Sequence, residues 1–130
     1  MIHQNTILSL LAKCKSMREL KKLHGLIVTT PTIKSIIPLS KLIDFCVDSE
    51  FGDINYADLV FRQIHTPSVY IWNSMIRGFV NSQNPRMSML LYSQMIENGY
   101  SPDHFTFPFV LKACCLIAYQ DCGKCIHSGI

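Results

Sequence analysis

The 130-residue sequence is poor in charge and in the residues that interrupt secondary structure. Only 16% of its residues are charged and 48% are hydrophobic, while glycine and proline number six each. So few glycines and prolines exclude a collagen-like chain or a flexible linker, and the hydrophobic content excludes an intrinsically disordered protein. The composition therefore predicts a folded protein with about one domain's worth of core.

Long apolar runs and secretion signals are also lacking. The most apolar stretch, 105–119, is interrupted by Thr106, Pro108 and Lys112 before it reaches the length that spans a bilayer. No apolar signal-peptide core follows Met1, so the six cysteines favour a reducing compartment over three disulfides. We expect neither a transmembrane helix nor a disulfide framework.

The formal net charge of +3 is unevenly distributed. Residues 1–41 contain seven Lys or Arg but only one acid, Glu19, whereas residues 42–130 contain five bases and eight acids. The N-terminal cluster weakly resembles an organelle-targeting presequence, but it could equally be the solvated face of a first helix or a contact for phosphates. Its members are Lys13, Lys15, Arg18, Lys21 and Lys22.

Adjacent apolar pairs recur along the chain at intervals of 32, 33 and 35 residues. The pairs are Leu10-Leu11, Leu42-Ile43, Met75-Ile76 and Val110-Leu111. Other apolar residues follow the i, i+4, i+7 spacing of one helical face, so each unit contains two amphipathic helices. Such units cannot bury their apolar faces alone and must stack on their neighbours. The sequence therefore predicts an all-α fold of the α-solenoid class.

Capping and breaking residues lie between these apolar series. Ser16 and Glu19 form a capping box, and Gly52-Asp53 separates two helical patterns. Asn84-Pro85 supplies an N-cap and the first residue of a helix, and Asn98-Gly99 ends that helix. Thr106 is the N-cap of the next helix, which places Pro108 in its first turn. Each expected helix thus has a local start or stop signal.

Residues 69–103 closely resemble a pentatricopeptide repeat. They open on Trp72-Asn73, close on Gly99-Tyr100-Ser101-Pro102-Asp103 and are 35 residues long. The residues that follow Trp72 do not match the tetratricopeptide repeat pattern Trp-x-x-Leu-Gly-x-x-Tyr.

The neighbouring units resemble the length variants of the plant subclass that alternates standard, long and short motifs. Residues 36–68 are similar to the short type, and residues 4–35 to a degenerate long type. Residues 104–130 resemble a long type that stops before its second helix is complete. We therefore expect the N-terminal fragment of a longer protein.

The resemblance implies a right-handed superhelix that binds single-stranded RNA in mitochondria or chloroplasts, one nucleotide per repeat. The mitochondrion is our first expectation and the chloroplast the alternative. This subclass resembles site-specificity factors for cytidine-to-uridine editing, whose chemistry belongs to a separate C-terminal zinc domain with a His-x-Glu signature. No His-x-Glu occurs in this sequence. We therefore expect RNA and editing-complex proteins as partners, and no enzyme activity, cofactor, metal, membrane or small-molecule substrate.

The resemblance also implies which residues contact RNA. In residues 69–103 the base would be read by Asn73 and Asp103, a combination similar to the family's uracil-preferring pair. In the short unit it would be read by Ser40 and Ser68. Base stacking falls to Tyr70 and Phe105, with Ile37 in the equivalent place of the short unit. The long-type positions Leu8, Ser35 and Pro108 offer still fewer ways to distinguish a base. The structural alternative is that Asn73 is a first-turn residue, Asp103 a cap and Phe105 ordinary packing.

Other functions compete with this interpretation. A protein-interaction solenoid would need no polar pair at residues 73 and 103. A thiol enzyme or zinc site would use Cys122 and Cys125, with His127 or Cys114-Cys115 as further ligands, although their helical phase favours packing. The recurrence of His24 and His127 at matching positions also favours packing over catalysis. An acidic stretch with no base inside it indicates that RNA runs elsewhere; it comprises Asp44, Asp48, Glu50, Asp53 and Asp58.

Overall fold

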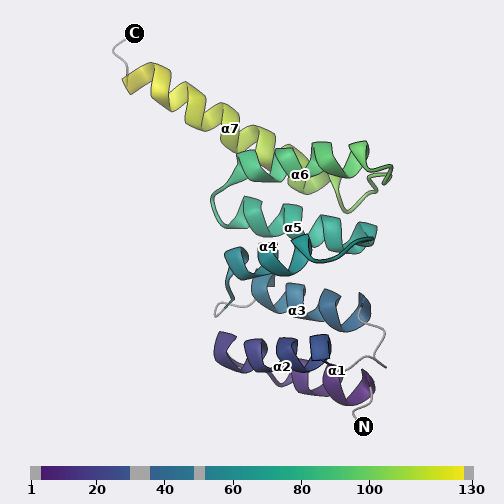
Figure 1. Cartoon of the computed structure of the whole chain (residues 1–130). Coiled ribbons are helices and arrows are strands. Elements are labelled where there is room, and N and C mark those ends of the chain that lie inside the picture. Colours follow the sequence, from purple (N-terminus) through teal and green to yellow (C-terminus); the bar gives the residue numbers. More distant parts are fainter. Residues whose placement is uncertain (1–3, 30–35, 49–51, 128–130) are drawn as a thin grey trace. The chain divides into compact units, whose positions relative to one another are not determined.

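The computed structural model describes residues 4–29, 36–48 and 52–127, with side chains described for 8–27, 38–48 and 52–122. Within these ranges the chain forms seven α-helices and no strand (Figure 1), which confirms the predicted all-α fold. The chain divides into two compact units, residues 1–71 and 72–130. Each unit is built from helices of the predicted amphipathic kind.

The first unit contains α1 (Gln4–Ala12), α2 (Met17–Thr29), α3 (Ile36–Asp48) and α4 (Ile54–Arg62). Helix α1 packs against α2 and α3, α2 also packs against α3, and α3 packs against α4. The apolar pair Leu42-Ile43 is fully buried, whereas only Leu11 of the pair Leu10-Leu11 is buried. The remaining core is supplied by Leu20, Ile27, Cys46, Ala57, Val60 and Phe61.

The predicted caps of this unit are present. The Glu19 backbone N–H donates to Ser16 Oγ at 3.2 Å, and the Glu19 carboxylate accepts from the Lys15 backbone N–H at 3.0 Å. Asp53 caps α4 by accepting from the backbone N–H groups of Asn55 and Tyr56. Gly52 comes so close to the carbonyls of Phe45 and Cys46, near the end of α3, that no side chain fits there. A glycine is therefore needed where the chain turns from α3 into α4.

The second unit contains most of α5 (Val69–Asn81), together with α6 (Pro85–Glu97) and α7 (Phe107–His127). The buried Ser88 hydroxyl on α6 donates to the Ile76 carbonyl on α5 at 2.8 Å. Helix α7 packs against α6, and an ion pair of 2.6 Å joins Arg86 to Asp121. The apolar core is supplied by Met75, Ile76, Phe79, Val80, Leu91, Met95, Val110 and Ala113.

Both α5 and α6 end with a residue in the left-handed region. Gly99 has φ 86° after α6, as the Asn98-Gly99 signal predicts, and the Tyr100 backbone N–H then donates to the Met95 carbonyl at 3.0 Å. After α5 the same conformation falls on Gln83, with φ 64°. The sequence does not indicate a left-handed residue there, because glutamine carries a Cβ that disfavours this region.

The start of α7 agrees with the prediction and its length does not. Thr106 precedes the helix, and Pro108 lies in its first turn. We expected residues 104–130 to hold a first helix and part of a second, but α7 runs unbroken for 21 residues. Cys114 and Cys122 therefore lie along one helix, not on two helices that face each other.

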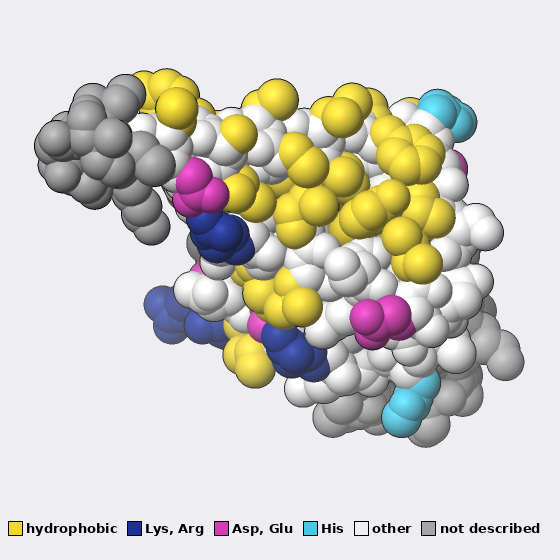
Figure 2. Space-filling model, turned by 90° about the horizontal axis from the view of Figure 1, so that it is seen from above, with side chains coloured by type: hydrophobic (Ala, Val, Ile, Leu, Met, Phe, Trp, Pro, Cys, Tyr) yellow, Lys and Arg dark blue, Asp and Glu magenta, His cyan; other side chains and the backbone are white. Residues whose placement is uncertain are grey.

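Helix α7 also leaves an apolar face open, as Figure 2 shows. Of the predicted pair Val110-Leu111, Val110 is buried and Leu111 is exposed. The exposed apolar residues on α7 also include Phe107 and Tyr119.

Candidate functional site

The structure brings Asn73 and Asp103 together across 30 residues of sequence. Asn73 lies in the early part of α5, and Asp103 lies in the loop between α6 and α7. The Asn73 Nδ2 donates to Asp103 Oδ1 at 3.0 Å. Because a carboxylate only accepts, this contact fixes which end of the Asn73 amide faces Asp103.

Thr106 completes the cluster by contacting the oxygen of the Asn73 amide. Its hydroxyl lies 2.5 Å from Asn73 Oδ1 and 3.1 Å from Asp103 Oδ1. A hydroxyl has one proton, so the shorter contact marks Asn73 Oδ1 as the main acceptor. Thr106 is fully buried, and it therefore holds this geometry without competition from solvent.

Asp103 and Thr106 also cap the start of α7. Asp103 Oδ1 accepts from the Phe105 backbone N–H at 3.0 Å, and Thr106 Oγ1 accepts from the Asp103 backbone N–H at 3.0 Å. Desolvation alone would raise the pKa of Asp103, but hydrogen bonds from Phe105, Asn73 and Thr106 outweigh it, and the net shift of the pKa is downward. The carboxylate therefore stays ionised and acts as an acceptor throughout the physiological range.

Part of the hydrogen-bonding capacity of the Asn73 amide is left for a ligand. An amide has two N–H donors and two acceptor sites on its oxygen. Asp103 takes one donor and Thr106, 3.1 Å from the Asp103 carboxylate, takes one acceptor site on the same edge, so one N–H and one lone pair remain on opposite flanks of the amide. Asn73 is only 7% exposed, so a ligand could contact only a small part of this side chain.

The two candidate stacking residues both have accessible rings. Phe105 is 62% exposed and lies beside the His104 ring at a centroid distance of 4.1 Å. Tyr70 is 53% exposed, and its hydroxyl donates to Asp44 Oδ2 at 2.6 Å. Asp44 belongs to the acidic stretch that the sequence places away from RNA, so a base stacked on Tyr70 would lie close to that stretch after all.

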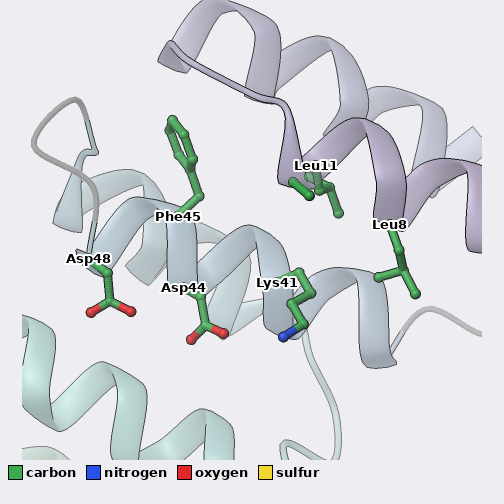
Figure 3. Close-up of a pocket in the computed structure, with 7 residues that line it drawn as sticks. Leu8, Leu11, Lys41, Asp44, Phe45 and Asp48 are labelled. Carbon is green, nitrogen blue, oxygen red and sulfur yellow. The ribbon is translucent and has the colours of Figure 1, made fainter.

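The candidate pair of the short unit has a different setting. Ser68 Oγ accepts from the Ile71 backbone N–H at 3.3 Å and so caps α5. Ser40 lies on α3 and is partly buried. Leu8 lines a hollow of about 480 Å³ between α1 and α3, together with Lys41, Asp44 and other residues (Figure 3). This hollow is lined by residues of the first unit.

The remaining candidates make no comparable cluster. Ser35 lies outside the described residues, as do the side chains of Ile37, Cys125 and His127. Among the described side chains, no three His, Cys, Asp or Glu residues gather in a way that could hold a metal ion. Burial raises the pKa of Cys46 to about 12, so this thiol stays protonated in the core.

Comparison with known proteins decides the family. Residues 67–116 match the PPR repeat family. The chain is also 51% identical over 129 residues to a pentatricopeptide repeat-containing protein of Arabidopsis thaliana, an alignment that covers 98% of this chain and 23% of that relative. The chain belongs to the pentatricopeptide repeat family.

Further pentatricopeptide repeat relatives from the same plant carry organellar names. A mitochondrial one is 38% identical over 125 residues, covering 94% of this chain and 18% of the relative. A chloroplastic one is 38% identical over 130 residues, covering 99% of this chain and 18% of the relative. The chain thus spans about a fifth of the length of these curated relatives. Over its described length, no helix combines the size and apolar character needed to cross a membrane.

Sequence reasoning missed two contacts in this pentatricopeptide repeat chain. It treated Thr106 only as a helix cap, although its hydroxyl reaches back to Asn73. It also separated Tyr70 from Asp44, which are hydrogen-bonded. The spacing of Asp103 and Thr106 at a helix start signals reciprocal capping, but no sequence pattern reveals a contact across 33 residues.

Proposed function

We propose that this chain is a sequence-specific single-stranded RNA-binding segment of a plant organellar protein. The same proposal places residues 69–103 opposite one nucleotide, with uracil preferred and cytosine next. The observation that carries it is the oriented Asn73 amide, which keeps one donor and one acceptor available in fixed directions. Uracil presents a matching pair, because its N3–H donates and its neighbouring carbonyl accepts.

The finer parts of the proposal rest on the family resemblance. The alternation of short and long units supports the plant subclass that includes editing factors, and the N-terminal part of such a protein would recognise RNA without catalysing a reaction. Relatives named mitochondrial or chloroplastic support an organelle, with the mitochondrion as the first candidate. Tyr70 and Phe105 would add stacking of roughly 1–3 kcal/mol per base, which is indifferent to base identity.

The test is a binding series with short RNAs that differ only at one nucleotide, with all four bases placed there. We expect weak binding by the 130-residue chain, because its basic charge is concentrated near one end and few phosphates can be neutralised. Asn73→Thr should lower affinity for uracil by about 1–3 kcal/mol and shift the preference toward a purine, since a hydroxyl cannot replace the amide's paired donor and acceptor.

Asn81→Thr is the matched control. Asn81 lies at the end of the same helix, and its side chain accepts from Lys112 Nζ at 3.0 Å, outside the Asn73 cluster. This variant should leave the order of base preference unchanged. If Asn73→Thr and Asn81→Thr both preserved the order, Asn73 would not be the reader, and a protein-interaction solenoid would become the better interpretation.

A further inference from the structure

The Asn73 amide is oriented by two groups of opposite character. The Asp103 carboxylate accepts from Nδ2, and the Thr106 hydroxyl beside it donates to Oδ1. A rotation that exchanged Nδ2 and Oδ1 would bring two oxygens together at Asp103, where the present separation is 3.0 Å. The same rotation would remove the acceptor from the Thr106 proton.

We infer that Thr106 is a positioning residue for base readout, which holds the Asn73 amide in the orientation that selects uracil over cytosine. This inference rests on the proposed function of Asn73. Thr106 acts through Asn73 and Asp103. It is fully buried, and its hydroxyl both donates to Asn73 Oδ1 and accepts from the Asp103 backbone N–H at 3.0 Å.

Orientation matters because the two pyrimidines differ by a reversal of the same edge. At ring positions 4 and 3, uracil presents an acceptor and then a donor, whereas cytosine presents a donor and then an acceptor. For a pyrimidine ring in one position, the remaining Nδ2–H of a fixed amide can donate to the uracil carbonyl but opposes the amino group that cytosine has there. An amide that can rotate pairs with both. Discrimination between uracil and cytosine therefore depends on the groups that prevent rotation.

This division of roles separates two kinds of selectivity. In the proposed function the Asn73 side chain itself favours a pyrimidine over a purine, and that side chain is kept when Thr106 is changed. The amide orientation affects only the choice between the two pyrimidines. Loss of the Thr106 hydroxyl should therefore reduce the uracil-to-cytosine ratio while leaving the pyrimidine-to-purine ratio close to that of the unmodified chain.

Thr106→Val and Thr106→Ser provide the test. Valine keeps the shape of threonine and removes the hydroxyl, and serine keeps the hydroxyl. We expect Thr106→Val to lower the ratio of uracil to cytosine affinity by about three- to tenfold, the effect of one lost hydrogen bond. Thr106→Ser should restore most of that ratio.

Ser88→Ala is the control for a merely structural effect. Ser88 is also a fully buried hydroxyl in the second unit, where it donates to the Ile76 carbonyl at 2.8 Å. Its removal should lower stability and leave both base ratios unchanged. An unchanged uracil-to-cytosine ratio in Thr106→Val, with Asn73→Thr still altering base preference, would overturn the positioning role and leave the proposed function intact.

A second measurement needs no RNA. In nuclear magnetic resonance spectra, the two Asn73 Nδ2 protons should give separate signals, and the proton bonded to Asp103 should be protected from exchange with water, in the unmodified chain and in Thr106→Ser. In Thr106→Val their signals should shift and lose protection. If the chain bound no RNA, the proposed function would be wrong, and so would the inferred role of Thr106 in selecting a base. Unaltered Asn73 amide signals in Thr106→Val would refute the positioning of the amide itself.

Discussion

The two units of the chain treat their candidate readout positions differently. In the second unit, Asn73, Asp103 and Thr106 are linked by side-chain hydrogen bonds. In the first unit, the corresponding positions hold Ser40, Ser68 and Ile71. Ser68 caps α5 as Asp103 caps α7, but Ile71 is a fully buried apolar residue that has no group to donate.

This difference shows what a readout position requires besides a polar side chain. A serine hydroxyl has one donor that rotates freely, so it can pair with a donor or an acceptor on the base. An asparagine whose Nδ2 and Oδ1 are both hydrogen-bonded presents its remaining donor and acceptor in fixed directions. Under the proposed function, the capacity to distinguish bases would therefore depend on neighbouring groups that restrict rotation, and Thr106 would be such a group beside the pair Asn73 and Asp103.

The largest expected effect concerns the packing of the first unit. Gly52→Ala should destabilise the chain by about 1–3 kcal/mol, because the added Cβ would overlap the carbonyls of Phe45 and Cys46 and force the backbone to move. Urea denaturation followed by circular dichroism measures this loss. Gly25→Ala is the matched control in α2: a Cβ there meets no other atom within 4 Å. That substitution should stabilise by about 0.5–1 kcal/mol through helix propensity. Equal effects of the two would show that the turn after α3 is not tightly packed.

The second prediction transfers the cluster from one unit to the other. The combination Ser40→Asn, Ser68→Asp and Ile71→Thr should create a uracil preference of roughly tenfold at a neighbouring nucleotide, at the lower end of the scale for a good bidentate contact. The RNA series is repeated with that nucleotide varied. Ile71→Thr alone is the control, which should cost stability without creating a preference. A triple variant that remains indifferent to the base would show that these three side chains do not suffice.

The helices and their caps could be predicted from sequence because they depend on contacts within a few residues. Asp53, Asn84 and Gly99 act where local chemistry places them. The contact between Asn73 and Asp103 could be expected only from the family resemblance, since no local rule joins residues 30 apart. Thr106 remained a cap in the sequence interpretation for the same reason. The unbroken length of α7 was not predicted, because the expectation of two helices within residues 104–130 came from the family resemblance and not from a local stop signal.

The third prediction concerns acid sensitivity in the first unit. Burial lowers the pKa of His24, whose Nδ1 lies 2.6 Å from the Tyr56 hydroxyl, and Lys21 lies over the Tyr56 ring. Nε2 of His24 is buried with no hydrogen-bond partner among the described residues. The unfolded chain therefore takes up a proton at higher pH than the folded one.

The sign of the pH effect follows from this difference. Stability should be complete above the unfolded pKa of about 6.5 and should fall as the pH is lowered through it, until the folded pKa is reached. Denaturation midpoints measured at several pH values should fall less steeply in His24→Leu than in the unmodified chain. Parallel curves for the two proteins would contradict a contribution from His24.

The smallest expected effect lies in the second unit, at the end of α5. Gln83 has φ 64°, a conformation that costs a residue with a Cβ but not glycine. Gln83→Gly should therefore stabilise the chain, by up to about 1 kcal/mol, because relief of this strain exceeds the added freedom of the unfolded chain.

Gly99→Ala makes the opposite change at the end of α6, where φ is 86°, and should destabilise by a similar amount. Thermal denaturation of both variants measures the pair. Gln83 is exposed, and its backbone N–H donates to the Val80 carbonyl at 3.2 Å, a bond that does not involve the side chain that is replaced. A loss of stability in Gln83→Gly would mean that the glutamine side chain contributes more than its backbone conformation costs.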